Sequence, residues 1–393
     1  MAMAISGDSE IVAFTEEQDE LRRFARDFAD KRIDVRALRE DEDSKTFPHR
    51  LWNELSSAGL HGLGVPKEYG GAGGGMMEQV IVEEELARNL GGLTTLWSIN
   101  THSASTIARY GTDKQKQELL PAMAEGQCRI ALSFTEPGGG TDVLGHLATH
   151  AKLDGEHFVL NGSKTFTTMA EDSHYFLVLA RTSSGGRKHD GLTVFLIPSD
   201  RAGIEVQRIP TMGHESFGTH NVYYSDVVVA PEEVIGEVDQ GWVYLSSTIN
   251  HERVIIAALC TGTIQGVVDR AVGYAREREA FGKPIGQFQA IQHYIAEIEI
   301  SRQASRLLTY HAASLAVRDK PYALEAAVAK AFASEACSRA ADLGIQILGG
   351  YGYTKDYDME RFWRDTRIMR IGPITNEMVR NYVAEQLGLP RSF

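Results

Sequence analysis

A carboxylic acid stands among apolar residues in the stretch from 241 to 283. Spacings of four, three, four and three residues predict one face of a long amphipathic helix, formed by Leu245, Ile249, Glu252, Ile256 and Leu259. A carboxylate among apolar side chains is costly unless it is paired or protonated. Glu252 could therefore pair with an arginine or turn to water, or it could be a desolvated general base that takes a proton from a substrate.

Two stretches rich in glycine and threonine could bind a flat or phosphorylated ligand. In LSFTEPGGGTD, the hydroxyls of Thr135 and Thr141 can donate hydrogen bonds, and the glycines between them let backbone N–H groups approach a ligand. In NGSKTFTT, Phe166 could lie against a flat ring, with Thr168 beside it as a donor. Each stretch also fits a plainer interpretation, as a glycine-rich hairpin loop and as ordinary strand alternation.

Two helix ends carry further polar groups. Arg278 and Gln289 flank a Gly-Lys-Pro turn, and an arginine beside such a turn suits a pyrophosphate, although it could equally be a solvated arginine at a helix end. A second predicted helix breaks at Gly349 and Gly350, where these glycines and Gln346 could line an adenine or phosphate site.

The elements that position these groups form three parts, in the order α, β, α. Residues 1–125 read as helices, which begin at the capping box Thr15–Gln18, at Pro48, at 76, at 98 and after Thr112, the last ending near Pro121. Residues 126–240 form a mostly antiparallel β domain, with strands at 159–160 between two tight turns, 175–181, 192–198, 204–209 and 221–229. Residues 241–393 form a helical bundle, with helices at 241–280, 288–318, 321–348, 358–370 and 375–387.

Composition limits the class of protein and its partners. With 393 residues, 43% hydrophobic and 24% charged, the chain is typical of a soluble globular protein. A net charge of −13 argues against nucleic acid or an anionic membrane surface as a general partner, but leaves room for a local basic pocket. Three scattered cysteines and no HExxH spacing predict a reducing compartment and no metal. No basic leader and no run of transmembrane length are recognised, which predicts a cytoplasmic protein, with a processed organellar protein as the alternative.

Taken in order, TEPGGGTD, NGSK, the helix with HER, REAFGKPIGQFQ and QILGGYGYTKDY resemble the acyl-CoA dehydrogenase family over essentially the whole chain. The resemblance implies an α+β fold with an N-terminal helical domain, a middle antiparallel β domain and a C-terminal four-helix bundle. It also implies FAD between the β domain and the bundle, and a homo-oligomer, usually a tetramer, that shares FAD across a subunit contact. A role in fatty acid and lipid metabolism would follow.

The resemblance also assigns roles residue by residue. It implies FAD contacts for Phe134, Thr135, Thr141, Phe166 (where the family usually has Trp), Thr168, Arg278, Phe281, Gln289, Gln346, Gly349, Gly350, Thr375 and Glu377. Those from Arg278 to Gly350 would reach the FAD of the neighbouring subunit, whereas Thr375 and Glu377 lie in the loop that commonly holds FAD. It implies substrate contacts for Thr141, Arg253 and Gly372.

The family oxidises an acyl-CoA thioester to the trans-2-enoyl-CoA: a carboxylate removes the α proton, the β hydrogen leaves as hydride to flavin N5, and electrons pass to electron-transfer flavoprotein. Many members place the catalytic Glu in the last loop, where this chain has Pro373, which cannot act as a base. Members resembling the isovaleryl- and long-chain types place it on the long helix before an arginine, here Glu252–Arg253. The apolar seam and this placement together favour Glu252 as the base over a structural salt bridge.

Pro373 departs from the family in a second way. A backbone N–H at that position normally helps to hold the substrate carbonyl, and proline has none. Another N–H or the FAD ribityl hydroxyl would then serve, and the small wall made by Gly372 and Pro373 suggests room for a branched or bulky acyl group. The alternatives are an acyl-carrier-protein thioester as substrate, a flavin oxidase or monooxygenase on the same fold, and a non-catalytic homologue.

Overall fold

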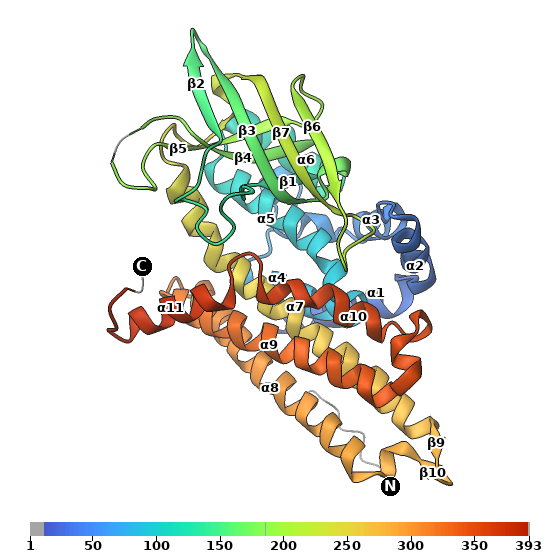
Figure 1. The fold of residues 1–393 in the computed structure, drawn as a ribbon. Helices are drawn as coiled ribbons and strands as arrows, with labels where there is room; N and C mark the ends of the chain where they lie inside the picture. Colours follow the sequence, from blue (N-terminus) through green and yellow to red (C-terminus); the bar gives the residue numbers. More distant parts are fainter. Residues whose placement is uncertain (1–11, 185, 392–393) are drawn as a thin grey trace.

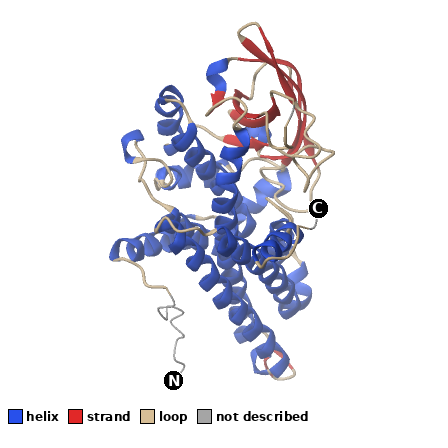
Figure 2. Ribbon diagram, turned by 90° about the vertical axis from the view of Figure 1, so that its left-hand side faces the viewer, coloured by secondary structure: helices blue, strands red, loops and turns tan. Residues whose placement is uncertain are grey.

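The computed structural model describes residues 12–184 and 186–391. Figure 1 shows the main sheet at one end of the molecule and a short hairpin at the opposite end of the helices, and Figure 2 shows most of the strands gathered at one end. The predicted α, β, α order and the α+β class are confirmed. The N-terminal helices are α1 (Glu16–Arg32), α2 (Val35–Ser44), α3 (His49–Ser57), α4 (Met76–Leu90), α5 (Thr95–Tyr110) and α6 (Asp113–Ala124).

Local signals account for most of these helices. The capping box predicted at Thr15 starts α1, and the cap predicted at Thr112 starts α6, where the structure shows a capping box as well. The expected end near Pro121 is wrong, because α6 continues to Ala124. Pro121 removes one backbone hydrogen bond, but the fully buried Met123 stabilises the turn that follows it. α2 was not predicted, because its many charged residues obscure the spacing of its apolar ones. Asp34 caps this helix by accepting hydrogen bonds from Arg36 N and Ala37 N.

The β part is one sheet with the order β6-β7-β3-β2-β4-β5-β8, and β1 pairs in parallel with β4. Its strands are β1 (Ile130–Ser133), β2 (His150–Asp154), β3 (His157–Thr168), β4 (Tyr175–Arg181), β5 (Leu192–Pro198), β6 (Ile204–Ile209), β7 (Thr219–Val229) and β8 (Val234–Ile235). The turn expected at Asn161–Gly162 is wrong. β3 runs through it with a shift in register against β7, so the glycine marks a bulge inside a long strand.

The C-terminal part consists of α7 (Gly241–Glu277), α8 (Gln289–Val317), α9 (Ala323–Leu348), α10 (Met359–Thr366) and α11 (Asn376–Gln386). α7 runs through the middle and packs against α4, α8 and α9 (Figure 1). Contrary to the expectation from the sequence, α7 is long and apolar enough to cross a membrane, judged by length and composition alone. However, 72% of its apolar 18-residue segment is buried inside the protein, as in the core helix of a soluble fold.

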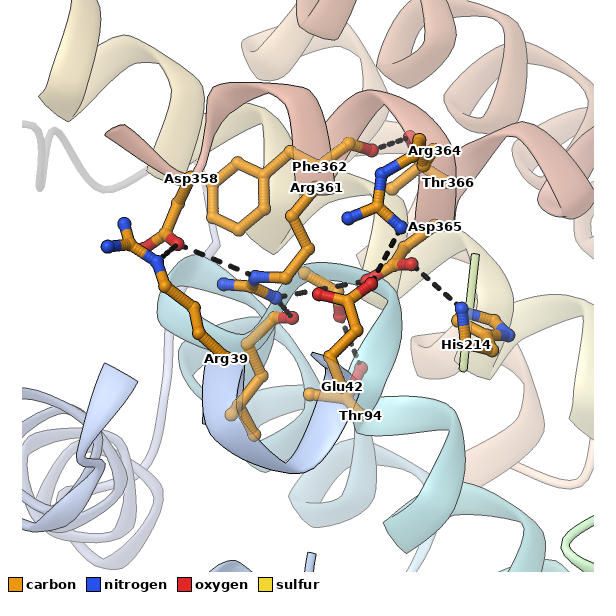
Figure 3. A network of polar contacts seen from close by, with 12 residues as sticks. Arg39, Glu42, Thr94, His214, Asp358, Arg361, Phe362, Arg364, Asp365 and Thr366 are labelled. Carbon is orange, nitrogen blue, oxygen red and sulfur yellow. Dashed lines mark hydrogen bonds and ion pairs between the residues drawn. The ribbon is translucent and has the colours of Figure 1, made fainter. Parts of the chain in front are cut away.

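A buried polar network joins the three parts (Figure 3). Arg364 on α10 donates to Glu42 on α2 at 2.6 Å, and Asp365 accepts from the backbone N–H of His214, in the β part, at 3.0 Å. Asp365 is only 1% exposed, so the network lies inside the molecule. Because charged groups at such a depth need fixed partners, this junction holds the C-terminal helices in one orientation against the sheet.

A second buried acid, Glu83 on α4, has no such partners. It is fully buried, and neither carboxylate oxygen has a hydrogen-bond partner among the described residues. The hydroxyl of nearby Thr94 donates to Gly91 O instead. Burial raises the pKa of Glu83 to about 8, so the neutral acid is the form that the fold accepts.

We expect Glu83→Gln to stabilise the protein. Because the pKa of Glu83 is higher in the folded than in the unfolded chain, the native protein loses stability as pH rises from about 4.5 toward 8. Glutamine carries no charge, so the free energy of unfolding at pH 8 should rise by on the order of 1–3 kcal/mol, with little change at pH 4.5. Denaturant titrations at both pH values measure this difference, and a variant less stable than wild type at pH 8 would contradict it.

Candidate active site

Glu252 lies in the fourth turn of α7, near Lys330 of the neighbouring helix α9. Its side chain keeps some exposure, yet protein surrounds it closely enough for desolvation to raise its pKa to about 7. The charges of Lys330 on α9 and of Arg253 oppose that rise. No described residue forms a hydrogen bond or ion pair with Glu252. The structure therefore does not support a structural salt bridge, and leaves a carboxyl group that can change its protonation near neutral pH.

Arg253 is occupied elsewhere. It is 7% exposed, donates to Asn250 Oδ1 at 3.0 Å, and its guanidinium lies 5.5 Å from the ring centre of Tyr382 on α11. Its Nε has no partner among the described residues. Arg253 thus joins α7 to α11 and keeps one buried donor without a partner.

The segment that leaves β1 is held from both sides. Lys164 on β3 donates to Phe134 O at 3.0 Å and to Glu136 Oε1 at 2.9 Å, and Thr165 N donates to Thr135 O at 2.8 Å. Glu136 also accepts from two backbone N–H groups, at Ala148 and Thr149. The backbone of Phe134 and Thr135 is therefore fixed, while both side chains remain partly exposed. The ion pair between the lysine of NGSK and the glutamate of TEP is a finding of the structure, because the two motifs lie far apart in the sequence.

Phe166 turns out of the sheet next to this segment. The register between β3 and β7 shifts between Lys164 and Thr167, and Phe166 has a left-handed φ of 57°, uncommon for a residue with a bulky side chain. Its ring is 62% exposed. Thr168, two residues on, is partly buried and pairs with Thr219. A bulge and a strained residue that aim an aromatic ring outward suit a surface built for a ligand.

Thr141 lies in the exposed loop between β1 and β2, and no described residue hydrogen-bonds its side chain. At the last loop, Gly372 is partly buried and Pro373 exposed. Thr375 caps α11 by accepting from Met378 N at 3.3 Å, and Glu377 is exposed in the first turn of that helix.

A groove of about 460 Å³ lies at the far end of the bundle. It brings together Arg278, where α7 ends, with Gly349 and Gly350, where α9 ends, and it is completed by Tyr274, Ile285, Ile347, Leu348, Tyr351 and Thr354. The guanidinium of Arg278 lies 5.7 Å from the ring centre of Tyr351. The sequence analysis did not single out the tyrosines, although GGYGYTKDY places several beside the glycines.

Three other residues proposed for this end lie on the surface outside the groove lining. Phe281 stands 96% exposed on the hairpin of β9 (Glu279–Ala280) and β10 (Lys283–Pro284), its ring centre 6.0 Å from that of Phe288. Gln289 is exposed at the start of α8, and Gln346 is exposed near the end of α9. The predicted residues thus lie in three places: at the sheet, around Glu252 between α7, α9 and α11, and at the far end of the bundle.

Family models cover most of the chain in three segments. The N-terminal, middle and C-terminal domains of acyl-CoA dehydrogenase match residues 15–127, 131–227 and 239–388. A 3-(aryl)acrylate reductase of Clostridium sporogenes is 37% identical, over 95% of this chain and 99% of that protein. The chain belongs to the acyl-CoA dehydrogenase family. It is an FAD-dependent oxidoreductase.

Two further proteins resemble this chain, one compared in sequence and one in structure. Subunit CarC of the caffeyl-CoA reductase–Etf complex of Acetobacterium woodii is 35% identical, over 95% of this chain and 99% of that protein. The structure of butyryl-CoA dehydrogenase from Megasphaera elsdenii superposes with a TM-score of 0.90 at 30% identity, over 96% of this chain and all of the other.

The residues of this acyl-CoA dehydrogenase fit FAD. A Cβ added at Gly350 would meet no other atom within 4 Å, so packing within the chain does not require this glycine, and the bare backbone leaves room for a ligand in the groove. Arg278 lines the same groove and can donate to a pyrophosphate. At the sheet, no described residue hydrogen-bonds the Thr135 hydroxyl, and Phe166 follows Thr165, which donates its N–H to Thr135 O, and exposes its ring.

Proposed function

We propose that this protein oxidises an acyl-CoA thioester to the trans-2-enoyl-CoA, with Glu252 as the base that removes the α proton. The environment of Glu252 is the main support for this proposal. Glu252 is an unpaired carboxyl group on α7, and burial raises its pKa to about 7. A base of this strength accepts a proton at pH 8, where it is mostly ionised. FAD, when bound, supplies the acceptor for the hydride that leaves the β carbon.

The other predicted residues would hold the cofactor and the thioester. Thr135, its backbone fixed by Thr165, would donate to the flavin ring, and Phe134, Phe166 and Thr168 would lie along it. Arg278, Gly349 and Gly350 would bind the far part of an FAD, with Phe281, Gln289 and Gln346 at its edge. Thr375, the N-cap of α11, and Glu377, in its first turn, would also contact FAD. Thr141, Arg253 and Gly372 would contact the thioester.

The reverse reaction is a second candidate. Two relatives at 37% and 35% identity carry the names of reductases of an aryl acrylate and of caffeyl-CoA. A carboxyl group with a pKa of about 7 can also return a proton to the α carbon, since near neutral pH both protonation states are populated. The small wall made by Gly372 and Pro373 suits a branched or aromatic acyl group in either direction.

We further propose electron-transfer flavoprotein as the electron partner, because the name of CarC places that relative in a complex with Etf. A homo-oligomer, expected to be a tetramer, is supported by Phe281, exposed at a hairpin tip beside the groove that holds Arg278. The mass of the flavin-loaded protein in solution tests this. A cytoplasmic place in fatty acid and lipid metabolism is the corresponding proposal for its cellular role.

Anaerobic visible spectra of the purified protein test the proposed function. Addition of straight, branched and aryl-substituted acyl-CoAs should bleach the flavin band for the substrate class that fits. If the reductive direction prevails, an aryl-acrylyl-CoA should restore the band of chemically reduced protein. If only carrier-protein thioesters, only oxygen, or no thioester changes the spectrum, the proposal gives way to the acyl-carrier-protein, oxidase or non-catalytic alternative.

A further inference from the structure

We propose that Lys330 is a positioning residue for the reaction: its buried ammonium group ties the loop 371–376 to α9 and holds a fixed positive charge toward Glu252. The proposal rests on the proposed function, in that it assigns a device that keeps the base in its active form.

The tether is explicit in the hydrogen bonds. Lys330 is fully buried, and its Nζ donates to Ile374 O at 2.7 Å and to Asn376 Oδ1 at 2.8 Å. Asn376 is 1% exposed and donates through Nδ2 to Ser334 Oγ at 3.0 Å and to Glu335 Oε1 at 3.2 Å. The last loop and the first residue of α11 are therefore fastened to one face of α9. This is the loop that contains Pro373.

The charge on Lys330 has no evident structural purpose. Both acceptors of Nζ are uncharged, and no described carboxylate lies within ion-pair distance of it. Burying an ammonium group costs several kcal/mol unless a counter-charge offsets that cost. A neutral donor could bond a carbonyl and an amide oxygen with a smaller penalty. A cation at this place is therefore better explained by an anion that it faces, and Glu252 is the candidate on the adjacent helix α7.

Electrostatic coupling supports this pairing. Lys330 is the largest charge that lowers the pKa of Glu252 against the effect of burial, and burial lowers the pKa of Lys330 itself to about 8. The groups that act on Lys330 from the surrounding helices are Cys260, Arg253 and Glu252 on α7 and Glu377 on α11. The histidine next to Glu252, His251, packs edge-on against His102 of α5 and stays neutral, since burial lowers the pKa of each to about 4 and about 3.

Removal of a cation near Glu252 favours its protonated form, so the pKa of Glu252 should rise and less of the base should be ionised at pH 7. A purely structural tether would change the position of the loop, and with it KM or FAD retention, without moving the pH at which the base ionises.

The test measures proton removal apart from hydride transfer. An acyl-CoA with sulfur in place of the β methylene can lose its α proton but no hydride, so its α-deuterium uptake from heavy water reports the base alone. Wild type should show uptake that rises with pH through about 7. In Lys330→Gln and Lys330→Met this rise should move up by about one pH unit, while Lys330→Arg should keep it in place.

Controls separate charge from tether and from folding. Asn376→Ala removes part of the tether but leaves the charge, and Lys320→Gln makes the same charge change at an exposed site. Neither should move the rise. Thermal unfolding and the amount of bound FAD show whether each variant is folded. If Lys330→Met does not fold, the comparison is made between Lys330→Gln and Lys330→Arg. Unshifted uptake in Lys330→Gln would overturn the inference while leaving the proposed function standing. Absence of uptake in wild type would instead overturn the proposed function.

Discussion

Replacing Glu252 by glutamine should lower the rate of α-proton removal by about a thousandfold or more while leaving the protein folded and yellow. A positioned general base contributes on the order of 10²–10⁴ in rate. Among the described residues, no other carboxyl group acts on Glu252 closely enough to replace it as the base. Glutamine keeps the shape and removes the proton acceptor. The measurement is the rate of flavin bleaching by the substrate that the acyl-CoA panel identifies.

Stability should move in the opposite direction in this variant. Because burial raises the pKa of Glu252 above its ordinary 4.5 to about 7, ionisation of this group costs stability as pH rises through that window. Glu252→Gln should therefore be at least as stable as wild type at pH 8, which separates loss of chemistry from loss of fold. Glu277→Gln, an exposed change on the same helix, is the matched control. A Glu252→Gln enzyme that retains a tenth of the wild-type rate would place the base elsewhere.

The sequence was sufficient where one physical signal dominates. Apolar runs bounded by turn residues predicted β4 and β5 at their observed limits, and the caps at Thr15 and Thr112 located the starts of α1 and α6. The unusual position of Glu252 could be predicted because it is a single acid among apolar residues that repeat at helical spacing on a long helix. Short-range chemistry of this kind needs no knowledge of distant parts of the chain.

Other features depend on contacts between distant parts of the chain. The outward turn of Phe166 requires the shift in register with β7, which no local pattern encodes. Lys330 reads as a surface lysine, although it lies among alanines that occupy buried positions on α9, a signal that could have marked it as buried. Glu83 likewise looks like one of three ordinary helix acids until α4 is packed against α7. In each case tertiary packing decides the role of the residue.

A change at the ion pair of Lys164 and Glu136 should strongly affect both stability and FAD retention. Lys164 is fully buried, Glu136 is 6% exposed, and their 2.9 Å contact lies directly behind Phe134 and Thr135. Burial lowers the pKa of Lys164 to about 8, whereas the charge of Lys164 and several hydrogen bonds outweigh burial and lower the pKa of Glu136. The lowered pKa of Glu136 contributes stability at neutral pH that is lost on acidification, as this carboxylate takes up a proton.

Lys164→Met should destabilise the protein by about 3–5 kcal/mol, because it leaves a buried carboxylate without its counter-charge. It also removes the donor to Phe134 O, so FAD should be released at a lower denaturant concentration than in wild type. Denaturant unfolding at pH 7, followed by flavin fluorescence and by circular dichroism, measures both effects. Lys152→Met, an exposed change on β2, should alter neither.

The double variant Lys164→Met/Glu136→Gln distinguishes the buried charge from the lost packing. With the carboxylate gone, part of the lost stability should return, since the two changes remove one interaction and are not additive. The carbonyl of Phe134 would still lack its donor, so weak FAD retention should persist after stability recovers. A single variant that loses less than about 1 kcal/mol, or a double variant that binds FAD as wild type does, would show that this pair does not position the segment after β1.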